Sequence, residues 1–195
     1  MTVFKPDLNE SIIRKNKKDL SYFLSNHDFD KFIAGASQKV FKYADLENQI
    51  RFEDILPEKL DYAIILIESK KNSGHWVCLL RNNNQFEYFG SYGLSHQEAL
   101  NFAPQAMNQF LGNEMKDMRG MISNLKKNQS FSINKTKYQN VKYLNDVGTC
   151  GRHVMMRIQS HLMGVCSAKY KDYIDNQCKL FNLPSDVIAT MMVKV

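Results

Sequence analysis

The sequence lacks the features that mark several common protein classes. Its four cysteines, among 195 residues, have neither the CxxC spacing of a zinc site nor the density of a disulfide scaffold. Its longest apolar runs, such as AIILI at 63–67, are far shorter than the roughly 20 residues that span a bilayer. The N-terminus has no continuous apolar stretch of the kind found in a secretion signal. We therefore expect a chain that is not secreted, with reduced thiols, no metal site and no membrane anchor.

A strong charge of either sign is also missing. Lysine and arginine total 26 against 20 for aspartate and glutamate, which gives a net charge of +6. The basic residues gather at 14–18 and 126–142, and such clusters are more often solvated surface than binding sites. Because 44% of the residues are hydrophobic, the composition is that of a soluble globular protein that can bury a sizeable core.

Three strands form the clearest pattern in the chain. DYAIILIES at 61–69, HWVCLLR at 75–81 and QFEYFG at 85–90 are rich in strand-forming residues, and KKNSG and NNN provide the turns between them. This pattern predicts an antiparallel meander.

Helical spacing flanks the meander on both sides. It predicts an amphipathic helix within 9–25, a helix over 95–111, one that begins near Thr149, and two more at about 167–182 and 184–191. The polar stretch 123–137 is expected to be a loop or weak strand, and 138–145 a further strand. The sequence thus predicts one α+β domain over 1–195, with a helical part at 1–60, a core at 61–165 and C-terminal helices at 166–195.

Cys150 and His75 are the candidates for chemistry. Cys150 falls at the expected start of a helix, where unpaired N–H groups and the helix dipole favour a thiolate, which is the nucleophilic form of cysteine. His75 stands where a strand begins, and a neutral histidine beside a cysteine can take its proton. Each residue alone is more often structural than catalytic.

Two supporting roles would complete such a site. Glu87 is a candidate for the acid that orients the histidine ring. The oxyanion of acyl transfer needs hydrogen-bond donors, which the Cys150 backbone N–H and an amide side chain from Gln139 or Asn145 could provide. The sequence leaves the choice of amide open.

The motifs GHW at 74–76, FEYFGSYG at 86–93 and DVGTCGRHV at 146–154, in this order, resemble the adenovirus-type cysteine proteases, the clan that includes adenain and the SUMO-specific proteases. The forms TCGRH and SYG are most similar to virophage and Polinton-like, mavirus-type maturation proteases. The resemblance is firm over 61–165. It implies an adenain-like, papain-like fold: a central, mostly antiparallel sheet flanked by helices, with the nucleophile at a helix N-terminus.

The resemblance also implies the roles of single residues. Cys150 matches the nucleophile, His75 the general base, and Trp76 the tryptophan that walls a narrow substrate groove, although a core aromatic is an equally good reading of Trp76. The acid departs from the family pattern. The register through FGSYG puts Gly90 at the acid position, and the register through EYFG puts Glu87 there. The two registers place opposite strand faces toward His75, and we favour Glu87.

The function that the resemblance implies is a viral thiol protease that cleaves capsid or virion precursor proteins after small residues. No cofactor is expected to be required, although the adenovirus relative suggests stimulation by DNA and weak nucleic-acid contact. The expected place of action is the virion and the host-cell cytoplasm. A deconjugating protease for ubiquitin-like tails and a non-enzymatic, basic DNA-binding virion protein remain as alternatives.

Overall fold

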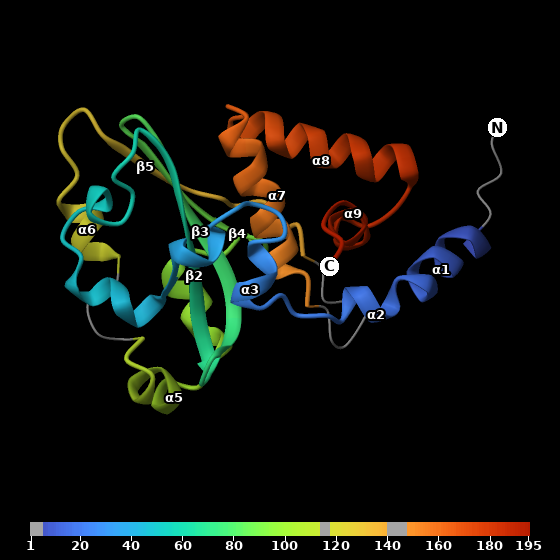
Figure 1. Ribbon diagram of the computed structural model, residues 1–195, viewed down its shortest axis with the longest axis horizontal. Coiled ribbons are helices and arrows are strands. Elements are labelled where there is room, and N and C mark those ends of the chain that lie inside the picture. The colour runs from blue at the N-terminus through green and yellow to red at the C-terminus, as the bar shows by residue number, and fades with distance from the viewer. Residues whose placement is uncertain (1–5, 114–117, 140–147) are drawn as a thin grey trace.

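The structure is a computed structural model that describes residues 6–113, 118–139 and 148–195. Its centre is a five-stranded sheet with the strand order β1-β2-β3-β4-β5 (Figure 1). The strands are β1 (Val40–Lys42), β2 (Leu60–Lys70), β3 (Ser73–Asn82), β4 (Gln85–Gly90) and β5 (Ser130–Ile133). The α-helices are α1 (Pro6–Lys15), α2 (Lys17–Leu20), α3 (Asn26–Phe29), α4 (His96–Ala99), α5 (Gln105–Phe110), α6 (Arg119–Ser123), α7 (Cys150–Leu162), α8 (Ser167–Phe181) and α9 (Ser185–Met192). The 3-10 helices are η1 (Ala36–Lys39), η2 (Tyr43–Asn48), η3 (Phe52–Asp54) and η4 (Leu100–Phe102).

The predicted meander is confirmed. Strands β2, β3 and β4 pair in antiparallel order, and Asn72 and Asn83 take left-handed backbone conformations in the two turns. Asparagine tolerates this conformation better than most residues, which explains why the asparagine-rich stretches become turns.

The edges of the sheet differ from the expectation. Strand β1 pairs with β2, and β5 with β4, both in parallel. The part of the chain at 1–60 is therefore not only helical, and the polar stretch at 123–137 contributes a true strand. Both strands have three or four residues, which is too short for a period-two pattern to be recognised in the sequence.

The sheet separates two hydrophobic cores. On one face, alternate residues of β2 and β3, such as Ile64 and Cys78, pack against α7, α8 and α9. On the other face, residues such as Ile65 and Val77 pack against η2, η3, α4 and α6. Figure 1 shows α7, α8 and α9 together on one side of the sheet, with α5 beyond its lower end. No described helix has both the length and the apolar character needed to cross a membrane.

The helices confirm the prediction at the C-terminus and correct it elsewhere. Helices α8 and α9 match the expected ranges. The helix expected at 95–111 is broken into α4, η4 and α5, because Pro104 cannot continue a helix and stands at the N-cap of α5. The first helical region ends at Leu20, and residues 22–25 have no helical structure. Most of the strand expected at 138–145 lies outside the described residues.

Candidate active site

Cys150 is the first residue of α7, as the sequence predicts, and its side chain is buried, with 4% exposed. Thr149 occupies the N-cap position. Burial raises the pKa of the thiol, and the backbone N–H groups of Trp76, Gly151 and Cys150 itself, which act on the sulfur, offset part of this rise. Because Trp76 directly follows His75 on β3, this contact brings the nucleophile candidate to the strand that carries the base candidate.

His75 lies near the start of β3, with 6% of its surface exposed. Burial, together with the charge of His153 on α7, lowers the pKa of His75 to about 3. The imidazole is therefore neutral at physiological pH, which is the form that accepts a proton. The Cys150 thiol acts electrostatically on the Tyr92 hydroxyl, and the Tyr92 ring centroid is 4.8 Å from that of His75. Cys150, His75 and Tyr92 thus gather at one end of the sheet.

The segment Leu20–Leu24, which runs from the end of α2 toward α3, is bound to this end of the sheet through three carbonyl groups. They accept hydrogen bonds of 2.8 Å each, Leu20 from the Gly148 N–H, Tyr22 from Arg152 Nη1, and Leu24 from Trp76 Nε1. A Cβ atom on Gly151 would come within 3.2 Å of both Leu24 and Trp76. A side chain after Cys150 would therefore push against this segment and against Trp76.

A groove of about 530 Å³ runs beside this segment. Its lining includes Leu24, Trp76, Gly74 and Lys42, so residues from the Leu20–Leu24 segment, β1 and the start of β3 form its walls. Trp76 lines this groove while its ring packs edge-on against Phe29 in the core.

The C-terminal helix α9 contacts the first turn of α7 through Asp186. This buried carboxylate accepts a hydrogen bond from the Thr149 hydroxyl, and one of its oxygens lies 3.2 Å from His153 Nε2. Arg152, also buried, donates to the Val193 carbonyl. The nucleophile helix is thereby fixed to the C-terminal end of the chain as well as to its N-terminal segment.

The structure corrects the prediction for Glu87. Its carboxylate is paired with the Arg157 guanidinium of α7 at 2.6 and 3.1 Å, and it accepts a third hydrogen bond from Ser167. On β4, Phe86 and Tyr88 share the face of His75. Glu87 lies between these two residues, so its side chain points to the opposite face of the sheet. Gly90 is the residue that faces the histidine, since a Cβ atom built there would lie 3.8 Å from His75 Nε2.

The structure describes one of the two amide candidates for the oxyanion site, Gln139, but not the other. Gln139 is buried at 1% exposure beside the end of β4, where its side-chain oxygen accepts a hydrogen bond of 2.8 Å from the Ser91 hydroxyl. Its backbone N–H also donates to the Ser91 carbonyl. Asn145 lies outside the described residues. Gln139 is therefore held firmly at the same end of the sheet as His75.

Several residues at this end of the sheet were not found from the sequence. Tyr92 stands in the SYG motif, and Arg152 and His153 stand in TCGRH, so these motifs carried a signal that was not assigned a role. Phe102 and Asp186 lie outside these motifs. They reach the site only through the fold of the chain, so no local pattern marks them. Of the other cysteines, Cys78 is buried, Cys178 is half-buried and Cys166 is exposed.

The charge state of Cys150 leads to a first prediction. Burial raises the pKa of its thiol, and the nearby Asp186 charge raises it too, against the lowering by backbone N–H groups. A raised pKa leaves the thiol protonated at neutral pH, so alkylation by iodoacetamide should be slow there and accelerate with a midpoint above about 8.5, the ordinary value. Mass spectrometry of labelled peptides between pH 5 and 10 measures this, with exposed Cys166 as internal reference. Fast labelling of Cys150 at pH 5 to 7 would show a resting thiolate instead.

A cysteine at a helix N-terminus, with its sulfur contacted by the backbone of the strand that carries a histidine and with a groove lined by the next residue of that strand, suits a cysteine peptidase. Comparison with known proteins agrees. The chain belongs to the Ulp1 protease family, because the model of the family's C-terminal catalytic domain matches residues 8–185.

Two relatives can be named. The uncharacterized protein V9 of Sputnik virophage is 29% identical over 180 residues, which cover 90% of this chain and 98% of V9. The crystal structure of the ASFV pS273R protease matches with a TM-score of 0.44 and 14% identity over 78% of this chain. The chain spans 62% of the length of that protease.

Proposed function

We propose that the chain is a viral endopeptidase that processes capsid or virion precursor proteins after small residues, of the Gly-Gly or Gly-Ala type. The observation that carries the proposal is the position of Cys150 in the first turn of α7, with its sulfur facing the strand of His75. The virophage relative, which is similar over nearly its whole length, supports a viral setting.

The proposed reaction proceeds through an acyl-enzyme. The Cys150 sulfur bonds to the scissile carbonyl carbon while its proton passes to His75. The carbon–nitrogen bond then breaks, and the imidazolium returns the proton to the leaving amine. Water attacks the thioester, the carbon–sulfur bond breaks, and the thiol and the neutral imidazole are restored.

The oxyanion formed in this reaction needs donors fixed in advance. We propose the Cys150 backbone N–H at the start of α7 and the side-chain amide of Gln139. The Ser91 hydroxyl supports this choice, because it occupies the Gln139 oxygen and so fixes which end of the amide is the donor. Asn145 stays the alternative that the sequence offers.

The preference for small residues is supported by the packing around the nucleophile. The Cys150 side chain is 4% exposed, and its neighbour Gly151 touches Leu24 and Trp76 so closely that a methyl group would not fit without a shift. We infer from this close packing that a peptide that reaches the sulfur is slim beside the bond that is cut.

The test is cleavage of the cognate capsid precursor by the purified protein. We expect N-terminal sequencing of the products to place the cut after a pair of small residues. Replacing the residue before the cut with leucine should lower kcat/KM about 100-fold, because the added side chain cannot enter the site. A cut after large residues, or an unchanged rate with leucine, would contradict the proposed specificity.

The same assay separates the alternative of a deconjugating protease, which the resemblance to the SUMO-specific proteases implies. A ubiquitin-like aldehyde probe that labels Cys150, together with an uncut capsid precursor, would indicate deconjugation. The family assignment speaks against a non-enzymatic DNA-binding protein.

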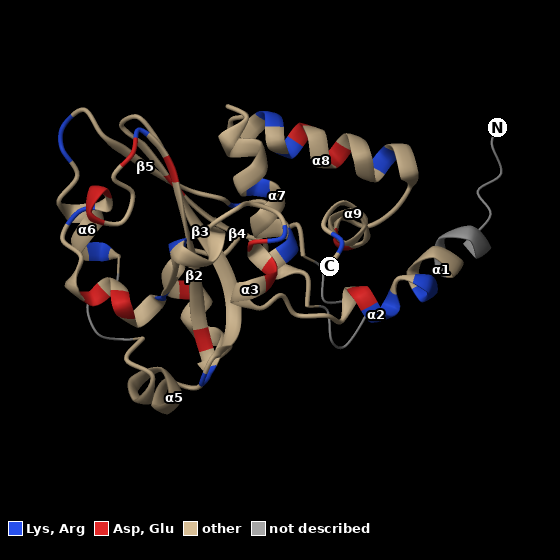
Figure 2. Cartoon of the chain, in the orientation of Figure 1, with Lys and Arg blue, Asp and Glu red and all other residues tan. Residues whose placement is uncertain are grey.

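We propose that the enzyme requires no cofactor. Nucleic acid would bind only weakly and could stimulate it. Figure 2 shows basic residues in α1 and α2 at one end of the molecule and in the loop between α6 and β5 at the other. Acidic residues lie in elements between them, so the basic residues of the described chain are divided between separate places. We propose action in the virion and the host-cell cytoplasm.

A further inference from the structure

The general base candidate has no carboxylate partner among the described residues. Gly90 stands beside His75 Nε2, and Glu87 is bound to Arg157 on the other face of the sheet. In a triad, the acid holds the imidazole in the orientation and tautomer that catalysis needs. Some other contact must therefore hold the ring here.

Two aromatic rings contact the imidazole. The ring centroid of Tyr92 is 4.8 Å from that of His75 with planes tilted by 42°, and the centroid of Phe102 is 4.9 Å away with a tilt of 50°. Tyr92 and Phe102 also contact each other at 5.0 Å, so the three rings form a closed cluster.

The backbone fixes both aromatic residues. Tyr92 lies in a tight turn closed by the hydrogen bond from the Gly93 N–H to the Gly90 carbonyl. Gly93 has a φ of 67°, and a Cβ atom there would collide with the Lys135 carbonyl, so the turn is held against the segment after β5. Phe102 ends η4, and the break in the helix before Pro104 directs it to the histidine.

We propose that Tyr92 and Phe102 are positioning residues that orient the His75 imidazole in place of the missing acid. The inference rests on the proposed roles of Cys150 and His75. Aromatic packing restricts the tilt of the ring but brings no negative charge to it. We expect the buried base to stay neutral at rest and to become an imidazolium only as Cys150 attacks. Among the described residues, His153 of α7 acts on the charge of His75, and Tyr92, on whose hydroxyl Cys150 acts, contacts its ring.

A double-mutant cycle tests this inference. Phe102→Ala should lower kcat about 10-fold with little change in KM, because the substrate still binds but the base is misoriented. Gly90→Asp supplies the acid, and its Cβ would make only ordinary contacts of 3.4 to 3.8 Å with Val77, Tyr88 and His75. In the Gly90→Asp protein, Phe102→Ala should cost less than about 3-fold, since the new carboxylate now holds the ring.

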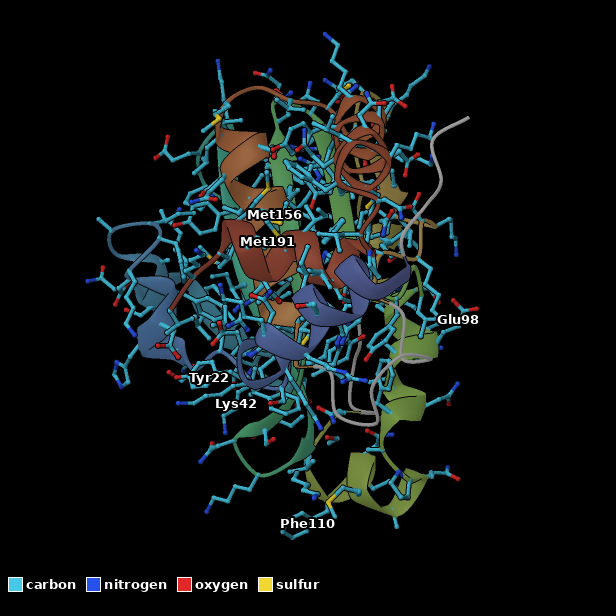
Figure 3. All side chains as sticks on the ribbon, turned by 90° about the vertical axis from the view of Figure 1, so that its right-hand side faces the viewer. Tyr22, Lys42, Glu98, Phe110, Met156 and Met191 are labelled. Atoms are coloured by element: carbon cyan, nitrogen blue, oxygen red, sulfur yellow. The ribbon has the colours of Figure 1, made fainter. Side chains whose placement is uncertain are left out.

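Two further readouts separate positioning from structure. Tyr92→Phe keeps the ring and should retain activity, whereas Tyr92→Ala should behave like Phe102→Ala. Gly90→Asp should raise the pKa of His75, visible as an imidazole titration by NMR moved to higher pH. Phe110→Ala is the matched control, because this ring is 82% exposed on α5 and lies at the tip of the molecule in Figure 3.

The outcomes are distinct. Equal losses from Phe102→Ala with glycine and with aspartate at position 90 would overturn the inference, as would full activity of the Phe102→Ala and Tyr92→Ala proteins. If Phe102→Ala did not fold, Phe102→Leu would replace it in the cycle, because leucine fills the space without the ring. An active wild type with an equally active His75→Ala would instead overturn the assignment of the base, and with it the proposed mechanism.

Discussion

Cys150→Ala is expected to lower cleavage of the capsid precursor by at least about 10⁴-fold. The substitution removes the sulfur that forms the acyl-enzyme, and loss of a hydrolase nucleophile typically costs on the order of 10⁶ in kcat. The helix dipole and the backbone N–H groups around the site remain in place, yet they have no group to activate. Initial rates on the precursor, followed by gel densitometry at several enzyme concentrations, measure the effect.

The matched control is Cys166→Ala. Cys166 is an exposed cysteine at the N-cap of α8 and is not part of the proposed site, so this variant should cleave at the wild-type rate. Both variants should melt within a few degrees of the wild type. Processing by the Cys150→Ala protein at an undiminished rate would refute the nucleophile, since a contaminating protease is excluded by preparing both variants in the same way.

Glu87→Ala is expected to destabilise the fold by about 3–5 kcal/mol. The change leaves the Arg157 guanidinium, 1% exposed, without its ion-pair partner, and an unpaired buried charge is costly. For a domain of this size the midpoint of thermal unfolding should fall by roughly 10 °C. Scanning calorimetry or circular dichroism measures the shift.

The double substitution Glu87→Met with Arg157→Met is the control for this effect. Replacing both charges by apolar side chains of similar length should restore most of the lost stability, because no charge then remains unpaired. Glu87→Gln, assayed well below its melting temperature, should retain nearly the wild-type rate of cleavage, since residue 87 faces α7 and not His75. A folded Glu87→Gln protein without activity would return Glu87 to the catalytic site.

The core of the fold could be read from the sequence because its signals are local. Strands β2, β3 and β4 are long, apolar and separated by asparagine turns, and α8 and α9 carry clear periodicity. Strands β1 and β5 could not be found, because their three or four residues are strands only through pairing with the longer strands beside them. The break at Pro104 was visible in the sequence, but apolar spacing across it outweighed the proline.

The candidate site shows the same difference between local sequence signals and contacts that the fold creates. Cys150 and His75 could be named as candidates from the sequence, because each stands at the start of an element within a short motif, and the same motifs offered Glu87 and Gly90 as alternative positions for the acid. The fold was needed to choose between these two, because strand alternation relative to the partners of β4 fixes which residue faces His75. The Phe102 contact with His75, the Leu20–Leu24 segment and the Asp186 contact also depend on the tertiary structure. They join parts of the chain that are distant in sequence, and no local pattern of residues encodes such a contact.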